Sequence, residues 1–272
     1  MAEELKGEYR IGWFSTGRDE AARHLLRAVW DSIEEGEIKA EITFVFSNRE
    51  PGETAESDLF FDLVKSYRIP LICLSSETLR KSNVDFWRGE FEKEAMRKLE
   101  GPRPRPDLCV LAGYMLIVGE EMCQRYPMIN LHPAAPGGPK GTWQEVIWQL
   151  IERKAEETGA MMHLVTPQLD EGPVVTYCTF SIWGEPFGKY WDKIKDRSIE
   201  EVKEQEGERN PLFREIRRHG LAREFPLIIA TIKAFSEGRV RIAEGNVVTS
   251  NGKPINGYNL SDKIDQKVRG TL

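Results

Sequence analysis

The stretch that decides the fold is YRIGWFSTGRDEAARHLLRAVWDSIEEG, residues 9–36. Its first six residues form an apolar run, which predicts a buried strand over 9–14. After a short turn, apolar residues recur at the spacing of an amphipathic helix over 20–36, and Gly36 is a suitable helix end. A buried strand that leads through a turn into such a helix is typical of α/β proteins.

The same alternation continues through the front half of the chain. Further strands are predicted from apolar runs at 40–48, 69–75, 108–113 and 128–131. Amphipathic segments predict helices within 53–67 and over 84–101. Continuous apolar strands that alternate with helices indicate a Rossmann-like, mostly parallel sheet with helices on both faces.

The pattern changes in the second half of the chain. A predicted helix over 142–157 is followed, within 159–182, by two strands that a turn separates. Residues 183–223 are strongly charged, with one predicted helix within 196–210. A helix over 226–237 and two short strand-like runs follow, so the rear part is smaller and mixed.

Composition and charge narrow the class of protein. A chain of 272 residues with 40% hydrophobic and 30% charged residues can bury a substantial core. A net charge of -6 does not indicate a surface for nucleic acid or an anionic membrane, so we expect small-molecule partners. The first ten residues are charged and no apolar run is long enough to cross a membrane, so we expect a cytoplasmic protein without a signal peptide. The four cysteines are scattered, and we expect reduced thiols and no metal site.

The run PMINLHPAAPGGPKGTW, residues 127–143, places Asn130 and His132 where a predicted strand ends. Side chains two apart on an extended segment point to the same side, and ligands of open parallel sheets bind beyond the carboxyl ends of the strands. An amide donor beside an ionisable imidazole suits an oxygen that gains negative charge during a reaction. The alternative is a histidine that only caps the strand end, but the position and the Pro/Gly-rich loop favour a functional role.

The turn FSTGRDEAA, residues 14–22, joins a strand to a helix start, where free amides form a natural anion site. Ser15, Thr16 and Gly17 are small, and Arg18 adds positive charge. The stretch is neither a dinucleotide fingerprint nor a P-loop. An ordinary turn in which Asp19 caps the helix explains the same residues equally well, so both interpretations stay open.

Asp170 occupies a predicted turn, Leu-Asp-Glu-Gly, and His163 lies on the strand before it. Asp and Gly are frequent in turns for backbone reasons, and a histidine on an apolar strand is usually a hydrogen-bonded core residue. Asp170 has a role in chemistry only if it contacts His132 in the folded protein. The carboxylate would then orient the imidazole and favour its protonated form.

The motif Asn-x-His-Pro after a strand, with a distant Leu-Asp-x-Gly-Pro-Val, resembles the folate-dependent formyltransferases, most closely the branch that formylates glycinamide ribonucleotide. The segment VLAGYMLIV, residues 110–118, is similar to the one that lines the folate pocket of that family. The resemblance implies a catalytic domain over 1–182, an inserted charged segment at 183–224, and a part at 225–272 that completes the same domain.

The resemblance also implies a role for each matching residue. Asn130 would bind the formyl oxygen, His132 would stabilise its negative charge, and Asp170 would pair with His132 and assist proton removal. The donor, 10-formyltetrahydrofolate, would be surrounded by Met115, Leu116, Ile117, Val118, Val165, Thr166 and Gly172. The phosphorylated acceptor would be held by Thr16, Gly17, Arg18, Asp19 and His163. The resemblance implies no metal, and we expect a monomer or a homodimer.

Two departures from the family concern the acceptor. The loop STGRDE is poorer in glycine than the phosphate loop of the family, and Leu221 stands where the family has the glutamate that holds the ribose hydroxyls. The inserted segment would then supply other contacts, from Arg217, Arg218 or His219. The alternatives are a formyltransferase for another amine, such as a sugar nucleotide, and a folate- or nucleotide-binding protein without catalysis. The joint presence of the three matched catalytic residues argues against the second alternative.

Overall fold

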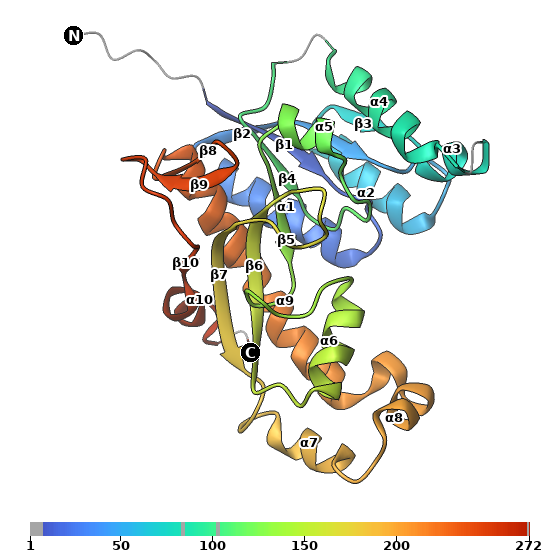
Figure 1. Ribbon diagram of the computed structural model, residues 1–272, viewed down its shortest axis with the longest axis vertical. Helices are drawn as coiled ribbons and strands as arrows, with labels where there is room; N and C mark the ends of the chain where they lie inside the picture. Colours follow the sequence, from blue (N-terminus) through green and yellow to red (C-terminus); the bar gives the residue numbers. More distant parts are fainter. Residues whose placement is uncertain (1–7, 83–84, 102–103, 271) are drawn as a thin grey trace.

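The computed structural model describes residues 8–82, 85–101, 104–270 and 272 (Figure 1). Its centre is an eight-stranded sheet in the order β10-β7-β6-β5-β4-β1-β2-β3. Its strands are β1 (Tyr9–Phe14), β2 (Ala40–Ser47), β3 (Leu71–Cys73), β4 (Leu108–Leu111), β5 (Met128–His132), β6 (Glu157–Leu164), β7 (Val174–Ser181) and β10 (Tyr258–Asn259). A second sheet pairs β8 (Val240–Ala243) with β9 (Asn246–Thr249). Residues 1–7, which carry most of the expectation about a signal peptide, and residue 84, the first of one predicted helix, lie outside the described residues.

The strands from β3 to β5 are parallel, whereas β6 and β7 form an antiparallel hairpin beside β5. This arrangement confirms the prediction of a mostly parallel sheet and of two strands joined by a turn within 159–182. The antiparallel register of β5 and β6 sets Asn130 directly opposite His163. Two residues far apart in the sequence are thereby neighbours at the edge of the parallel region.

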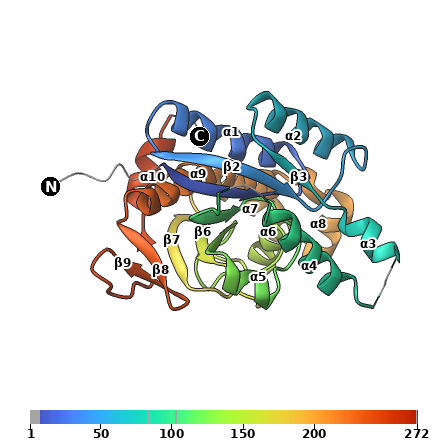
Figure 2. The same ribbon diagram turned by 90° about the horizontal axis from the view of Figure 1, so that it is seen from above.

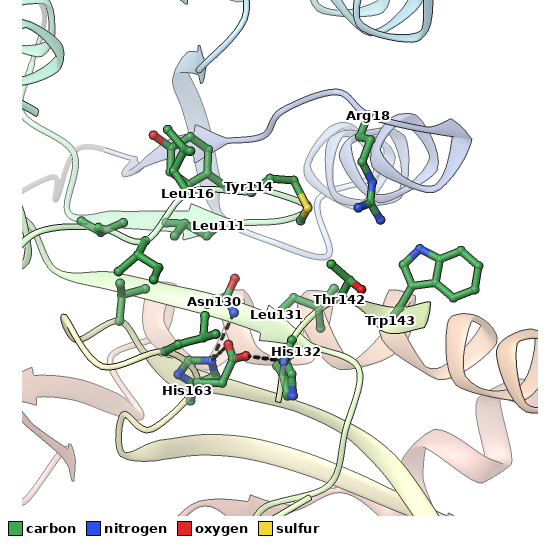
Figure 3. Close-up of a pocket in the computed structure, with 18 of the residues that line it drawn as sticks. Arg18, Leu111, Tyr114, Leu116, Asn130, Leu131, His132, Thr142, Trp143 and His163 are labelled. Carbon is green, nitrogen blue, oxygen red and sulfur yellow. Dashed lines mark hydrogen bonds and ion pairs between the residues drawn. The ribbon is translucent and has the colours of Figure 1, made fainter. Parts of the chain in front are cut away.

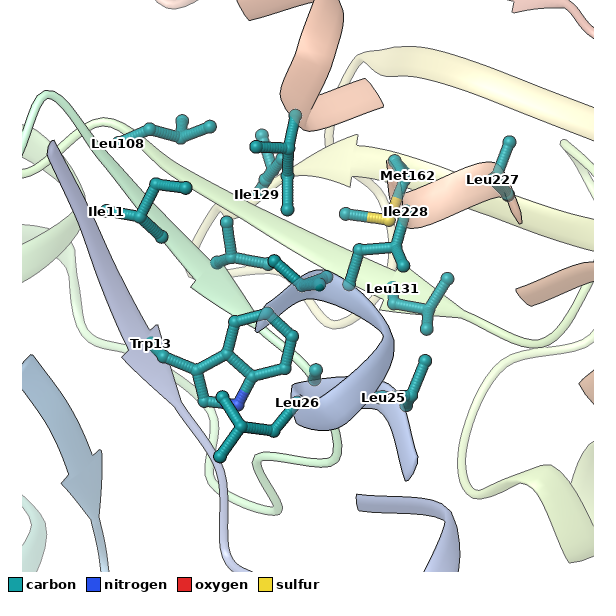
Figure 4. Close-up of a cluster of buried hydrophobic side chains, with 14 of the residues drawn as sticks. Ile11, Trp13, Leu25, Leu26, Leu108, Ile129, Leu131, Met162, Leu227 and Ile228 are labelled. Atoms are coloured by element: carbon teal, nitrogen blue, oxygen red, sulfur yellow. The ribbon is translucent and has the colours of Figure 1, made fainter. Parts of the chain in front are cut away.

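Helices cover both faces of the sheet (Figure 2), as predicted. One face carries α1 (Glu20–Glu34), α2 (Ala55–Ser66), α9 (Pro211–Ser236) and α10 (Ser261–Val268). The opposite face carries α3 (Ser76–Ser82), α4 (Trp87–Leu99) and α5 (Glu120–Arg125). Figure 4 shows part of the first core, in which Trp13 of β1 lies beside Leu26 of α1. Each such fully buried side chain contributes about 1.5–3 kcal/mol to stability.

An aromatic cluster on the opposite face anchors the segment that follows β4. The ring of Phe14 lies 5.2 Å from that of Phe46 and meets Tyr114 edge-on at 5.7 Å. Edge-on and offset ring pairs are favourable beyond the area that they bury. Tyr114 is therefore fixed by packing against the rings of the sheet, and the exposed residues Met115 and Ile117 directly follow this buried residue.

A third apolar cluster lies at the end of the molecule remote from β3 (Figure 1). It joins α6 (Trp143–Glu152), α7 (Gly188–Ile194), α8 (Ile199–Gln205) and the first half of α9, with the short 3₁₀ turn η1 (Gly207–Arg209) between α8 and α9. Helix α6 ends earlier than the predicted residue 157, because Lys154 adopts a φ of +48° and β6 begins at Glu157. The predicted helix within 196–210 is confirmed as α8.

Helix α9 is much longer than the helix predicted over 226–237. Asn210 caps its start by accepting from the Phe213 amide at 3.1 Å, and Pro211 occupies the first turn, where a missing N–H is tolerated. Pro226 lies inside the helix instead of at its start. The charged residues before Pro226 give no clear apolar pattern, so the first half of α9 was not predicted. Leu212 and Ile216 in that half are nevertheless buried. The domain boundary expected at 224 therefore falls in the middle of α9.

Replacing Gly220 by alanine should stabilise the protein by about 0.5–1 kcal/mol, because glycine is a poor residue for the interior of a helix. Gly220 lies within α9, and a Cβ built there meets no atom within 4 Å. Urea unfolding of the wild type and Gly220→Ala measures the difference. A variant that is less stable than the wild type would contradict this assignment of open space around α9.

Candidate active site

A cavity of about 590 Å³ opens beyond the carboxyl ends of β1, β4 and β5, the edge at which open parallel sheets bind ligands. Asn130, His132, His163 and Asp170 all line it. Figure 3 shows the first three of these residues close together on the floor of the cavity. The structure thus brings together residues from β5, from β6 and from the turn after β6.

Asn130 is oriented by His163. The ring Nδ1 of His163 lies 2.8 Å from the carbonyl oxygen of Leu164, which can only accept, so Nδ1 carries a hydrogen. In the neutral ring, Nε2 is then an acceptor, and the side-chain amide of Asn130 donates to it at 3.1 Å. One hydrogen of the Asn130 amide is used in this bond, and the second is left for a ligand in the cavity.

His132 is held from both sides. Its Nε2 donates to the carbonyl oxygen of Pro139 at 2.8 Å, and its Nδ1 lies 3.4 Å from Oδ2 of Asp170. The other carboxylate oxygen of Asp170 lies 3.6 Å from Nε2 of His163. The side chains of His132 and Asp170 are only 2% and 6% exposed. The condition for a chemical role of Asp170, contact with His132, is therefore met.

The turn that carries Asp170 has a positive backbone φ at Asp170 and a close backbone approach at Gly172. Asp170 itself adopts a φ of +54°, and its carboxylate accepts from the amide of Gly141 at 3.2 Å. A side chain on Gly172 would overlap the carbonyl oxygen of Leu164. Lys140 and Glu171 form an ion pair that joins the Pro/Gly-rich loop to this turn. Gly172 therefore shapes the turn, and it does not line the cavity as the resemblance implied.

Burial lowers the pKa of His132, because the charged ring loses its contact with solvent, although Asp170 and the Pro139 carbonyl act in the opposite direction. The pKa of Asp170 is also lowered. Burial of this carboxyl acts to raise its pKa, but the contact with His163, the charge of His132 and the amide of Gly141 together outweigh burial. At neutral pH the carboxyl is therefore ionised beside a largely neutral imidazole.

Acidification should lower the free energy of unfolding more steeply in the wild type than in His132→Gln. The unfolded imidazole has a pKa of about 6.5, and the folded pKa is lower, so the unfolded chain binds a proton first. Stability is thus unaffected by this group above about pH 6.5 and falls as the pH drops toward the lowered folded pKa. Urea unfolding across this range provides the comparison, and equal slopes in the two proteins would refute the buried, neutral state of His132.

One side of the cavity is apolar. Six of the predicted folate-binding residues line it, namely Met115, Leu116, Ile117, Val118, Val165 and Thr166. Met115 and Ile117 are 41% and 50% exposed, which is high for large apolar side chains. Such an exposed apolar surface beside a cavity is typical of a ligand site.

The loop after β1 differs from its predicted role. Thr16 and Gly17 do not line the cavity, and the amides of Ser15, Thr16 and Gly17 already donate to Phe46 O, Gly113 O and the Ser15 hydroxyl, respectively. The hydroxyl of Thr16 instead accepts from the Met115 amide at 2.9 Å, which supports the apolar side. These residues therefore do not form a cradle of free amides for a phosphate.

Of the predicted acceptor residues, Arg18, Asp19 and His163 do line the cavity. Asp19 caps α1 by accepting from the Ala22 amide at 3.1 Å, as the alternative interpretation of this turn held. His163 contacts Asn130 and Asp170, so it belongs to the catalytic group more than to the acceptor loop.

The sequence interpretation missed Trp143 and Glu224, which line the same cavity. Of the three residues named in the inserted segment, only Arg217 lines it. Arg218 is ion-paired to Glu215 at 2.6 Å, and the ring of His219 packs on Phe187. No sequence pattern singled out Glu224, because a charged residue on a long helix is usually solvated.

Two features are absent from the part of the chain that the structure describes. No helix there is both long enough and apolar enough to cross a membrane. No three histidine, cysteine, aspartate or glutamate side chains among those residues are arranged to share a metal ion.

The comparisons with known proteins agree with this geometry. The family described as formyl transferase matches residues 20–186. The phosphoribosylglycinamide formyltransferase of Escherichia coli (strain K12) is 27% identical over 237 residues, which span 86% of this chain and 92% of that protein. The formyltetrahydrofolate deformylase of Bacillus subtilis (strain 168) is 31% identical over 181 residues, spanning 64% of this chain and 50% of that protein.

Among solved structures, the phosphoribosylglycinamide formyltransferase of Coxiella burnetii superposes with a TM-score of 0.68 at 21% identity, over 93% of this chain and 99% of that one. This likeness establishes the fold. The family match itself spans more than half of the chain. The protein therefore belongs to the formyl transferase family and is a formyltransferase.

Proposed function

We propose that this enzyme transfers the formyl group of 10-formyltetrahydrofolate to the amine of glycinamide ribonucleotide. The observation that carries the proposal is the contact of Asn130 with His163 and of His132 with Asp170 in one cavity. These two pairs supply what formyl transfer to an amine requires. One offers a hydrogen-bond donor for an oxygen that becomes negative, and the other offers a group that takes up a proton.

Asn130 donates its free amide hydrogen to the formyl oxygen. His163 holds the side-chain amide in one orientation, so that the donor is in place before the reaction starts. A preorganised donor of this kind is typically worth about 10²- to 10³-fold in rate, because it costs no reorganisation when the charge develops. The positive charge that His132 gains on protonation adds to this stabilisation.

His132 and Asp170 accept the proton that the amine loses and pass it on. Because Nε2 of His132 already donates to Pro139, the nitrogen that titrates is Nδ1, which faces Asp170. The amine loses one proton as its nitrogen bonds to the formyl carbon, and the Asp170 carboxylate accepts this proton and shares it with Nδ1. The proton then passes to the folate nitrogen as the bond between that nitrogen and the formyl carbon breaks, so the protein ends as it began.

The apolar side of the cavity fits the donor. The exposed side chains of Met115 and Ile117 offer surface to a flat ring system, and Tyr114 supports the segment from below. When bound there, 10-formyltetrahydrofolate supplies the formyl carbon. The remaining half of the cavity, which carries Arg18 and Trp143, is then left for the acceptor.

The choice of acceptor is supported by the relatives. Proteins named phosphoribosylglycinamide formyltransferase from Escherichia coli (strain K12) and Haemophilus influenzae (strain ATCC 51907 / DSM 11121 / KW20 / Rd) each match over 92% of their length at 27% identity. This near-complete coverage supports an acceptor of the same kind. A deformylase relative has half of its length outside the match.

An acceptor panel tests the proposal. Release of tetrahydrofolate is followed with glycinamide ribonucleotide, with an amino-sugar nucleotide and with no amine. We expect kcat/KM for glycinamide ribonucleotide to exceed that for the sugar nucleotide by at least about 100-fold, since unpaired polar groups penalise the wrong ligand. A sugar nucleotide that is the better acceptor, or a rate that is the same without amine, would overturn it.

A further inference from the structure

A chain of side-chain hydrogen bonds runs beneath the segment that follows β4. Thr16 follows β1 and Asn48 follows β2, and their side chains meet beyond the carboxyl ends of these two strands. Thr16 is 2% exposed and Asn48 is 5% exposed, and neither residue lines the cavity. The proposed chemistry uses neither of them, although both side chains are polar and buried.

The direction of donation along this chain is fixed. The backbone N–H of Met115 can only donate, so the hydroxyl oxygen of Thr16 accepts from it at 2.9 Å. The hydroxyl hydrogen of Thr16 is donated to Oδ1 of Asn48 at 2.6 Å, and Nδ2 of Asn48 donates to the hydroxyl of Ser76 at 3.1 Å. Hydrogen bonds in series polarise one another, so the bond to Asn48 makes the Thr16 oxygen a better acceptor for Met115.

Thr16 holds the segment after β4 at two points. Its backbone N–H donates to the carbonyl oxygen of Gly113 at 3.0 Å, and its hydroxyl accepts from Met115, two residues further on. Gly113 adopts a φ of +70°, so the chain turns there. Between the two bonds Tyr114 packs on Phe14, whereas Met115 is 41% exposed and lines the cavity.

Thr16 is itself held in place from α2. The hydroxyl of Ser57, which is fully buried, donates to the carbonyl oxygen of Thr16 at 3.2 Å. The backbone N–H, the backbone carbonyl and the hydroxyl of Thr16 are therefore all hydrogen-bonded. Because the backbone at this position is fixed, another group cannot easily move in to replace a lost hydroxyl.

We propose that Thr16 and Asn48 are positioning residues for the folate donor, which set the affinity for 10-formyltetrahydrofolate by fixing segment 113–118 without touching the ligand. The inference rests on the donor in the proposed function. A segment that is already held in one conformation has less to lose in ordering when the ligand binds. Thr16 thus acts on the folate half of the cavity, and not on the acceptor half to which the resemblance assigns it.

Thr16→Val tests the role of the hydroxyl, because valine keeps the shape of the side chain. The Met115 N–H and Oδ1 of Asn48 both lose a partner in this variant. We expect the KM for 10-formyltetrahydrofolate to rise by about tenfold, as for the loss of one buried hydrogen bond. The value of kcat and the KM for the amine acceptor should stay within about threefold of the wild type. Thr16→Ser, which keeps the hydroxyl, should restore the KM for folate.

Thr43→Val is the matched control. The hydroxyl of Thr43, on β2, also donates to a backbone carbonyl oxygen, that of Ile11 at 3.1 Å, but Thr43 does not line the cavity. This variant should keep both KM values of the wild type. A rise in the KM for the acceptor alone in Thr16→Val, or no change in either KM, would overturn the inference.

Asn48→Ala tests the second member of the chain. The Thr16 hydroxyl then loses its acceptor, so the KM for folate should rise in this variant as well. Because the two residues act in series, the double variant with Thr16→Val should be no worse than the weaker-binding single variant. Increases in KM that multiply in the double variant would contradict this arrangement.

Amide hydrogen exchange, followed by mass spectrometry without any ligand, tests the positioning itself. Peptides that cover residues 112–118 should exchange at least about tenfold faster in Thr16→Val than in the wild type, Thr16→Ser and Thr43→Val, because the Met115 N–H loses its acceptor. Peptides from α9 should keep the rate of the wild type, which shows that the variant is folded.

Calorimetry with tetrahydrofolate completes the test, and Thr16→Val should bind it about tenfold more weakly than the other three proteins. Equal exchange and equal affinity in all four proteins would overturn the inference and leave the proposed function in place. Exchange and affinity that depend on the Thr16 hydroxyl, in a protein that does not formylate glycinamide ribonucleotide, would support the inference and refute the proposed acceptor instead.

Discussion

Asp170→Asn should lower kcat by about 10³-fold and change the KM for folate little, because a proton acceptor acts in the transition state and not in folate binding. Asparagine still accepts from the Gly141 amide, so the turn should keep its shape. It cannot take up a proton, and it no longer stabilises positive charge on His132, which Asp170 does in the wild type. Steady-state kinetics at saturating acceptor give the value of kcat.

Because His132 and Asp170 act as one unit, His132→Ala should cause a loss of the same order, and the double variant should be no worse than the slower single variant. His24→Gln is the control, since His24 is half-buried on α1 and does not line the cavity. Turnover within about tenfold of the wild type in Asp170→Asn, or losses that multiply in the double variant, would contradict the shared role.

Gly172→Ala should lower the free energy of unfolding by about 3 kcal/mol and abolish most activity as well. The new Cβ would overlap the carbonyl oxygen of Leu164, and a backbone atom cannot rotate away. The turn would have to open, which strains the hydrogen bond from Leu164 N to Pro173 O at 2.9 Å and moves Asp170 away from His132.

Gly220→Ala is the matched control for Gly172→Ala, because the same substitution in open space should stabilise α9. Urea unfolding and kcat of the two variants, measured side by side, separate the steric effect from the general effect of replacing glycine. A Gly172→Ala protein with the stability of the wild type would show that the turn accommodates a side chain and that its shape does not hold Asp170.

The sheet and most of its helices were predictable because buried parallel strands are continuous apolar runs. The run over 9–14 and the helix spacing after it predict β1 and α1 within a residue or two. Helix α9 was not predictable to the same extent. Its first half is largely charged, and Pro226 imitates a helix start, so only the tertiary burial of Leu212 and Ile216 reveals that the helix is continuous.

The candidate site likewise contains residues that could be identified from the sequence and residues that could not. Asn130 and His132 were identifiable because they end a strand two residues apart, and the motif around Asp170 linked that turn to them. In the acceptor half, Arg18 and Arg217 were named from the sequence, but Trp143 and Glu224 were not, because their places depend on contacts between α6 and α9 across the cavity. Arg217 stacks on Trp143, 74 positions earlier in the sequence, and no local pattern relates the two. The position of Thr16 under the cavity likewise depends on its bond to Met115.

The most direct test of the account is a single turnover with 10-formyltetrahydrofolate labelled in the formyl carbon, in the presence of glycinamide ribonucleotide. The arrangement of Asn130, His132 and Asp170 beside an acceptor half predicts that the label appears in formylated glycinamide ribonucleotide at the rate at which tetrahydrofolate is released. Asp170→Asn should lower both rates together. Label that appears as formate, with glycinamide ribonucleotide unchanged, would contradict the account, because water and not the amine would then be the acceptor.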